Sequence, residues 1–223
     1  MEVKFDGTII QKYINAITQD KYHRYKSWDN CFKIFLLEEP GDYHSLQLAF
    51  YLASWGMYRG SGGLLQKNHL IHEGAVEIIY KNAYKNLKCN ESHEVSKKDI
   101  PLIIQLKREL SNYYKNIPFV RGIKESKISD TGTLISKIIL GTTACVPAYD
   151  RYFILGLKDK AMRYSKFDEA SLNELFDLIE LHTNEIKKCQ EILTKTEIHY
   201  PAMKILDMHF WQIGYDNEMK IKA

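Results

Sequence analysis

Asp150 is the residue of this chain whose position most favours chemistry. It lies in the stretch LISKIILGTTACVPAYDRYF, residues 134–153, shortly after Pro147. Aspartate is a preferred N-cap residue, and a helix N-terminus stabilises a carboxylate as the anion. Such an anion can stabilise an oxocarbenium-like sugar while a glycosidic bond breaks, or it can deprotonate a water molecule. The alternative is that Asp150 only caps its helix, and spacing alone favours that alternative.

This stretch resembles the catalytic segment of the helix-hairpin-helix DNA glycosylase superfamily, in which a Val-Pro-x-Asp-like element carries the catalytic aspartate. The matching residues are Val146, Pro147 and Asp150, and Lys137 lies near the position where bifunctional members carry a Schiff-base lysine. The segment 200–214, YPAMKILDMHFWQIG, also resembles the closing helix of distant relatives. The resemblance covers about a third of the chain and implies a DNA glycosylase with Asp150 and Lys137 as catalytic candidates.

The chain departs from the family pattern in three ways. The usual Leu-Pro-Gly-Val-Gly hairpin is absent, and its nearest equivalent is residues 128–137, ISDTGTLISK, with one glycine. Lys137 precedes Asp150 by 13 positions, fewer than the family usually shows. No four-cysteine iron–sulfur loop is present. The resemblance therefore implies a monofunctional enzyme that relies on Asp150.

A glycosylase must draw its target base out of the DNA stack into a pocket lined by aromatic side chains. Here a glycine turn, residues 60–63, follows a segment rich in aromatic residues. Each aromatic residue alone is more often part of a core or a surface. The candidates for substrate binding are Trp55, Tyr58, Arg59, Tyr149 and Tyr152, and those for contact with the DNA backbone are Lys67 and Arg151.

Divergent stand-alone members of such folds occur among bacterial anti-phage proteins that excise hypermodified bases from viral DNA. By that similarity, the expected substrate is a bulky modified cytosine and the expected role is antiviral defence. The expected partner is DNA, and neither a cofactor nor a metal is expected.

The charge distribution is uneven and also bears on the partner. Residues 81–127 hold eleven Lys/Arg against five Asp/Glu, an excess of six, while the whole chain carries +3. A basic segment beside an acidic remainder is typical of a face for a polyanion, and equally of a solvated lysine-rich helix pair. One alternative function is therefore a non-catalytic nucleic-acid-binding or defence accessory protein that uses this segment.

The cysteines, histidines and apolar runs point to a reduced, cytoplasmic protein. The four cysteines are widely separated, which favours reduced and mostly buried thiols. His69, His72 and Glu73 have the spacing of half a metal site, but an exposed helix start or loop explains them better. No apolar run approaches the roughly 20 residues that cross a bilayer, and no signal peptide is evident.

The elements that must position these residues are helices. Apolar spacing predicts helices at 8–17, 45–58, 73–87, about 99–116, 134–140, 167–194 and 201–214, and one that begins at Asp150. We expect 45–58 to be buried on most faces, 167–194 to be the longest helix, and Gly214 to end the last helix above a buried Trp211. Residues 121–131 are turn-like, and strands have little support. The prediction is an all-α unit, residues 1–223, with a cleft between two packed lobes, 31–149 and 1–30 plus 150–223.

Overall fold

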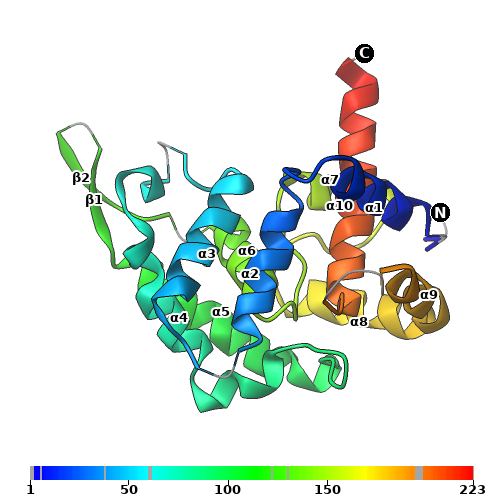
Figure 1. The fold of residues 1–223 in the computed structure, drawn as a ribbon, viewed down its shortest axis with the longest axis horizontal. Coiled ribbons are helices and arrows are strands. Elements are labelled where there is room, and N and C mark those ends of the chain that lie inside the picture. Colours follow the sequence, from blue (N-terminus) through cyan, green and yellow to red (C-terminus); the bar gives the residue numbers. More distant parts are fainter. Residues whose placement is uncertain are drawn as a thin grey trace.

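The computed structural model describes residues 3–5, 7–37, 39–59, 62–121, 123–129, 131–193 and 198–222, and it confirms the all-α class (Figure 1). The α-helices are α1 (Thr8–Gln19), α2 (Lys26–Phe35), α3 (Asp42–Ser54), α4 (Glu73–Ile79), α5 (Ile100–Lys115), α6 (Gly132–Thr142), α7 (Arg151–Asp159), α8 (Glu169–Leu181), α9 (Thr183–Leu193) and α10 (Ala202–Lys222). Short 3₁₀ helices are η1 (Leu64–Gln66), η2 (His69–His72), η3 (Asn82–Leu87) and η4 (Lys97–Asp99).

Three of the sequence-based boundaries are wrong. The segment 167–194 contains two helices, α8 and α9, which meet at His182, and α10 is longer than either. Gly214 lies inside α10, which continues to Lys222 because its glycine face packs against α7. Residues 73–87 form α4 followed by η3, and α2 was missed.

A β-hairpin occupies part of the segment that was expected to be turn-like. β1 (Pro118–Arg121) pairs antiparallel with β2 (Lys124–Lys127) in a register that places Pro118 opposite Lys127. It projects from one end of the molecule (Figure 1). Thr131 then caps α6 by accepting a hydrogen bond from the Leu134 N–H at 3.2 Å. The segment that precedes α6 is therefore a β-hairpin.

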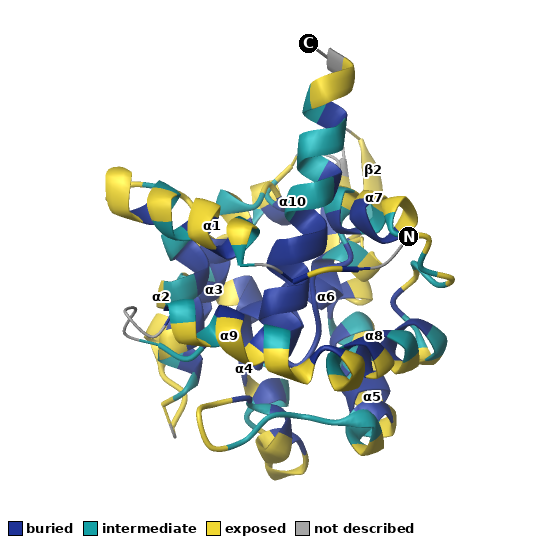
Figure 2. Ribbon diagram, turned by 90° about the vertical axis from the view of Figure 1, so that its right-hand side faces the viewer, coloured by how far each residue is buried: buried dark blue, intermediate teal, exposed yellow. Residues whose placement is uncertain are grey.

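The core is one connected cluster of buried side chains that extends from α1 to α10. Figure 2 shows α10 buried along its first half and more exposed toward its C-terminal end. α3 is less buried than expected, because Leu46 and Phe50 are 44% and 56% exposed. The division into two lobes stays a prediction. Within the described residues, no helix combines the length and the apolar character needed to span a membrane.

α7 and α10 approach so closely that only glycine fits at their crossing. A Cβ on Gly156 would lie 1.9 Å from the carbonyl oxygen of Phe210, and one on Gly214 would lie 2.0 Å from that of Tyr152. Both obstacles are backbone atoms, which cannot rotate away. This crossing fixes the start of α7, where Asp150 lies, against the first half of α10.

His72 is completely buried in the core, so the expectation that this histidine lies on an exposed helix start or loop is wrong. Its Nδ1 is 2.6 Å from the Tyr114 hydroxyl, and its Nε2 is 2.9 Å from the Tyr58 hydroxyl. Both ring nitrogens thus face tyrosines, which leaves the half-metal-site interpretation of this histidine without support. Burial, with a smaller effect of His69, lowers the pKa of His72 from 6.5 to about 3.

Acid should therefore destabilise the protein through His72. The unfolded chain binds a proton at this histidine near pH 6.5, and the folded chain does so only near pH 3. Between these values the free energy of unfolding should fall by about 1.4 kcal/mol per pH unit on account of His72. Urea unfolding at pH 7, 6 and 5 should show that slope in the wild type and not in His72→Gln. Parallel pH profiles for the two proteins would contradict this assignment.

Candidate active site

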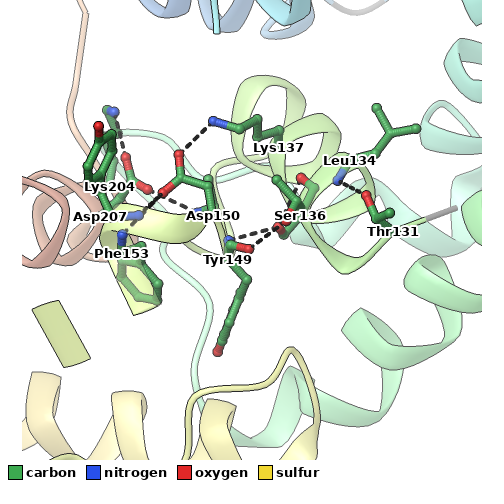
Figure 3. Close-up of polar contacts among 12 residues, drawn as sticks. Thr131, Leu134, Ser136, Lys137, Tyr149, Asp150, Phe153, Lys204 and Asp207 are labelled. Carbon is green, nitrogen blue, oxygen red and sulfur yellow. Dashed lines mark hydrogen bonds and ion pairs between the residues drawn. The ribbon is translucent and has the colours of Figure 1, made fainter. Parts of the chain in front are cut away.

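Asp150 is held by both of its carboxylate oxygens at the N-terminus of α7 (Figure 3). Oδ1 accepts hydrogen bonds from the N–H groups of Tyr152 and Phe153, each at 3.1 Å. Oδ2 accepts a hydrogen bond from Nζ of Lys137 at 2.8 Å. The expected capping role is confirmed, and it leaves Oδ2 facing a second charged side chain.

The ion pair of Lys137 and Asp150 is almost completely buried. The two side chains are only 4% and 13% exposed. Nζ of Lys137 also lies 5.1 Å from the ring centroid of Trp55. Burying two charges costs several kcal/mol of desolvation each, so a buried pair contributes little net stability. Such a pair at the wall of a hollow is a natural candidate for function.

The loop that presents Asp150 is fastened from two sides. The N–H of Tyr149 donates to Oγ of Ser136 at 2.8 Å, and Oγ1 of Thr133 donates to the carbonyl oxygen of Tyr149 at 2.9 Å. From the opposite side, the N–H of Ala148 donates to Oδ1 of Asp207 at 3.0 Å. α6 and α10 therefore hold the loop together, and Asp150 is positioned before any ligand arrives.

A second buried ion pair lies beside the first (Figure 3). Nζ of Lys204 is 2.9 Å from Oδ2 of Asp207, and the side chains are 3% and 9% exposed. Both residues come from the first turns of α10. Nζ of Lys204 also lies 4.8 Å from the ring centroid of Trp28. Two cations and two anions thus gather at one place in the core.

Both ion pairs line one of two adjoining hollows. The first, of about 210 Å³, is lined by the two pairs together with Tyr51, Trp55 and Trp211. The second, of about 300 Å³, shares four of these residues, Trp55, Trp211, Lys204 and Asp207. It adds a mainly apolar wall that consists of Ile9, Tyr13, Tyr25, Met208 and Gln212.

Three aromatic rings form a box at the second hollow. Tyr25 and Trp55 are parallel within 6° with centroids 5.8 Å apart, and Trp211 lies at 87° to both. The guanidinium of the exposed Arg24 lies 4.8 Å from the centroid of Trp55 and 5.6 Å from that of Trp211. The indole N–H groups of Trp55 and Trp211 are buried and lack a hydrogen-bond partner. Unpaired buried donors are rare, and a ligand with acceptor atoms would satisfy them.

The structure brings three of the predicted site residues together and places one beside them. Lys137, Asp150 and Trp55 line the first hollow. Tyr152 packs its ring 5.2 Å from that of Trp211, behind the box. Tyr149 is instead buried, donating or accepting a hydrogen bond with Ser171 through its hydroxyl at 2.9 Å.

The remaining candidates lie elsewhere. Tyr58 contacts His72 in the core, and Arg59 lines a separate hollow of about 440 Å³ with Ser129 and Thr131. Lys67 is half-exposed between η1 and η2, and Arg151 is exposed and paired with Glu218 at 2.7 Å.

Part of the predicted glycine turn, residues 60 and 61, lies outside the described residues. Gly63 itself is required by packing. Its φ is 81°, in the left-handed region that favours glycine, and a Cβ at this position would lie 2.6 Å from the ring of Phe119.

Sequence reasoning missed Tyr25, Tyr51, Lys204 and Asp207, and it assigned Trp211 to the core alone. One signal was available for the charged pair. Lys204 and Asp207 are three positions apart in the otherwise apolar run YPAMKILDMHFW, where two charges on a buried helix face require each other. Tyr25 follows a turn and has no periodic signal.

The four cysteines are buried and form no disulfide, which confirms the expectation of buried thiols. Across the part of the chain that the structure describes, no three His, Cys, Asp or Glu side chains are grouped so as to hold a metal ion.

The arrangement can place an anionic carboxylate next to a flat ligand held among aromatic rings. A scan against models of known protein families, a search of curated proteins and a search of solved structures each gave no match.

Proposed function

We propose that this protein is a DNA glycosylase that uses Asp150 to hydrolyse the N-glycosidic bond of a base held in the adjoining hollows. One observation carries the proposal: a preorganised, buried aspartate lies on the wall of a hollow that leads to an aromatic box. The rings of Tyr25, Trp55 and Trp211 line the second hollow, and the two unpaired indole N–H groups supply donors for the acceptor atoms of a base.

The chemistry follows from the charge on Asp150. As the C–N bond breaks, its electron pair leaves on the base and the sugar acquires positive charge, which the carboxylate of Asp150 stabilises. The oxygen of a water molecule then bonds to the sugar carbon, and the proton that this water loses ends on the departing nucleobase, which leaves as a neutral molecule. The products are a free base and an abasic site. In this scheme Lys137 positions the carboxylate and compensates its charge until the substrate binds.

The proposed substrate is a hypermodified cytosine in viral DNA, and the proposed role is antiviral defence. The hollow opens to solvent beside the aromatic box, which is where a base drawn out of the stack would enter. Arg24 lies over the box and is exposed, so its N–H donors can reach hydroxyl groups that a modified base carries outward.

The test is a panel of DNA substrates. Purified protein would be incubated with DNA that carries normal bases, hydroxymethylcytosine or glucosylated hydroxymethylcytosine, and mild alkali would then convert abasic sites into strand breaks. We expect breaks on one class of modified DNA only. Intact strands on every DNA, with DNA binding retained, would contradict the proposal and favour the binding-protein alternative.

Lys137 should not form a covalent adduct with DNA. Its ammonium group donates to Asp150 at 2.8 Å, and an ammonium nitrogen has no free electron pair to attack the sugar. Borohydride added during turnover should therefore trap no protein–DNA complex. A complex that disappears in Lys137→Gln would overturn the monofunctional assignment while leaving a glycosylase activity in place.

The alternative of a non-catalytic nucleic-acid-binding protein relies on the basic segment 81–127. Two lysines in the middle of this segment already contact other groups of the protein. Lys97 forms an ion pair with Asp177, and Lys107 donates to the carbonyl oxygen of Phe167. Charge reversal at Lys97, Lys98 or Lys107 would abolish function in cells under this alternative, whereas Asp150→Asn would leave function intact.

A further inference from the structure

A hollow that shares no lining residue with the candidate active site lies between the ends of α2 and α4 and along η3. Its empty volume is about 1040 Å³. One wall is apolar and consists of Leu36, Leu37 and Ile79. The other walls are polar, which makes this a hollow of mixed character.

The polar walls carry three lysines and two asparagines. Three lysines line the hollow, each separated from the next by three or four positions: Lys81, Lys85 and Lys88. Lys81 is already paired with Glu109 at 2.6 Å. Lys85 and Lys88 form no ion pair with any carboxylate among the described residues. The described residues that line the hollow thus include three lysines and no carboxylate.

Lys88 is held in place without a counter-ion. Its Nζ lies 3.4 Å from the ring centroid of Tyr80. That ring is itself fixed, because the Tyr80 hydroxyl donates to the carbonyl oxygen of Leu37 at 3.0 Å and lies 2.8 Å from Nε2 of His44. Burial lowers the pKa of Lys88 from 10.5 to about 8. A partly buried ammonium costs free energy until an anion accompanies it.

We propose that this hollow binds a small ligand that carries two or more phosphate groups on an apolar body, the chemistry of a nucleoside diphosphate or triphosphate. The ammonium groups of Lys85 and Lys88 neutralise the phosphates, and the side chains of Asn82 and Asn90 line the same hollow with amide groups. Leu36, Leu37 and Ile79 cover the apolar body. A hollow favours a small ligand over a nucleic-acid backbone, which lies along a surface.

The test compares three probes by isothermal titration calorimetry in buffer of physiological ionic strength: tripolyphosphate, ATP, and a short single-stranded DNA. The wild type would be measured beside Lys85→Gln/Lys88→Gln. The matched control is Lys187→Gln/Lys188→Gln, which removes two exposed lysines from α9. Thermal unfolding of each variant without ligand checks that the fold is retained.

We expect the wild type and the control to bind ATP with equal affinity and the hollow variant to bind it at least about tenfold more weakly. ATP should bind more tightly than tripolyphosphate, because Leu36, Leu37 and Ile79 also contact its apolar part. On binding, the titration of a ¹³C-labelled Lys88 should move to higher pH, because the phosphate stabilises its ammonium form. Equal ATP affinity in the hollow variant, no binding of ATP or tripolyphosphate, or a loss confined to single-stranded DNA would overturn the proposal.

Discussion

Asp150→Asn is expected to lower the rate of base release by a factor on the order of 10³. Asparagine caps helices about as well as aspartate, so the hydrogen bonds from the N–H groups of Tyr152 and Phe153 should persist. The amide carries no negative charge and cannot stabilise the sugar as the bond breaks. Single-turnover measurement of abasic-site formation gives this factor directly.

The matched control is Asp168→Asn, since Asp168 caps α8 in the same way by accepting a hydrogen bond from the Ser171 N–H at 3.0 Å. That variant should retain the full rate. Asp150→Asn also leaves Lys137 buried without a partner, which should destabilise the fold by about 3 kcal/mol. Adding Lys137→Gln should restore stability without restoring base release. Recovery of activity in this double variant would show that Asp150 acts only through the fold.

Gly156→Ala is expected to lower the melting temperature by about 5 °C or more. The new Cβ would lie 1.9 Å from the Phe210 carbonyl oxygen, and the backbone of α10 would have to move. Such overpacking costs about 3 kcal/mol or more, which exceeds the roughly 1 kcal/mol gained from the higher helix propensity of alanine. Because Asp150 directly precedes α7 and the second ion pair lies in α10, base release should decline together with stability.

Gly132→Ala serves as the matched control, because Gly132 is also helical and its new Cβ would lie 3.9 Å from Phe167, an ordinary contact. It should leave stability unchanged or raise it by up to about 1 kcal/mol. Differential scanning calorimetry of both variants checks the prediction. An equal melting temperature for the two would mean that α7 and α10 do not pack as closely as the structure has them.

The local part of this architecture could be predicted from the sequence. Two helix caps follow from residue types at short spacing, and both are present. Asp150 caps α7, and Ser96 and Asp99 form a capping box directly before α5. The length of α10 did not follow from local rules, because Gly214 is a helix breaker in isolation. Gly214 nevertheless lies inside α10, because the backbone of Tyr152 in α7 leaves no room for a side chain at this position.

The candidate site was only partly predictable for the same reason. Lys137 and Asp150 are 13 positions apart, and both belong to the stretch 134–153 that the sequence singles out. Lys204 and Asp207 come from α10, near the end of the chain, and Asp207 contacts the loop before Asp150. Tyr149 belongs to the same stretch but faces Ser171, because the turn between α6 and α7 directs it into the core. Contacts between distant segments decide which side chains face the hollow, and apolar periodicity carries no information on them.

The measurement that tests the central claim most directly is the quantification of free base and abasic sites in one reaction, by liquid chromatography and mass spectrometry. DNA that carries glucosylated hydroxymethylcytosine would be incubated with the wild type, Asp150→Asn and Asp168→Asn. We predict equal amounts of free base and abasic site with the wild type and Asp168→Asn, and formation of both products slower by a factor on the order of 10³ with Asp150→Asn. Free base released equally by folded Asp150→Asn would contradict the role of Asp150, and the absence of free base from every DNA tested would contradict the proposed function itself.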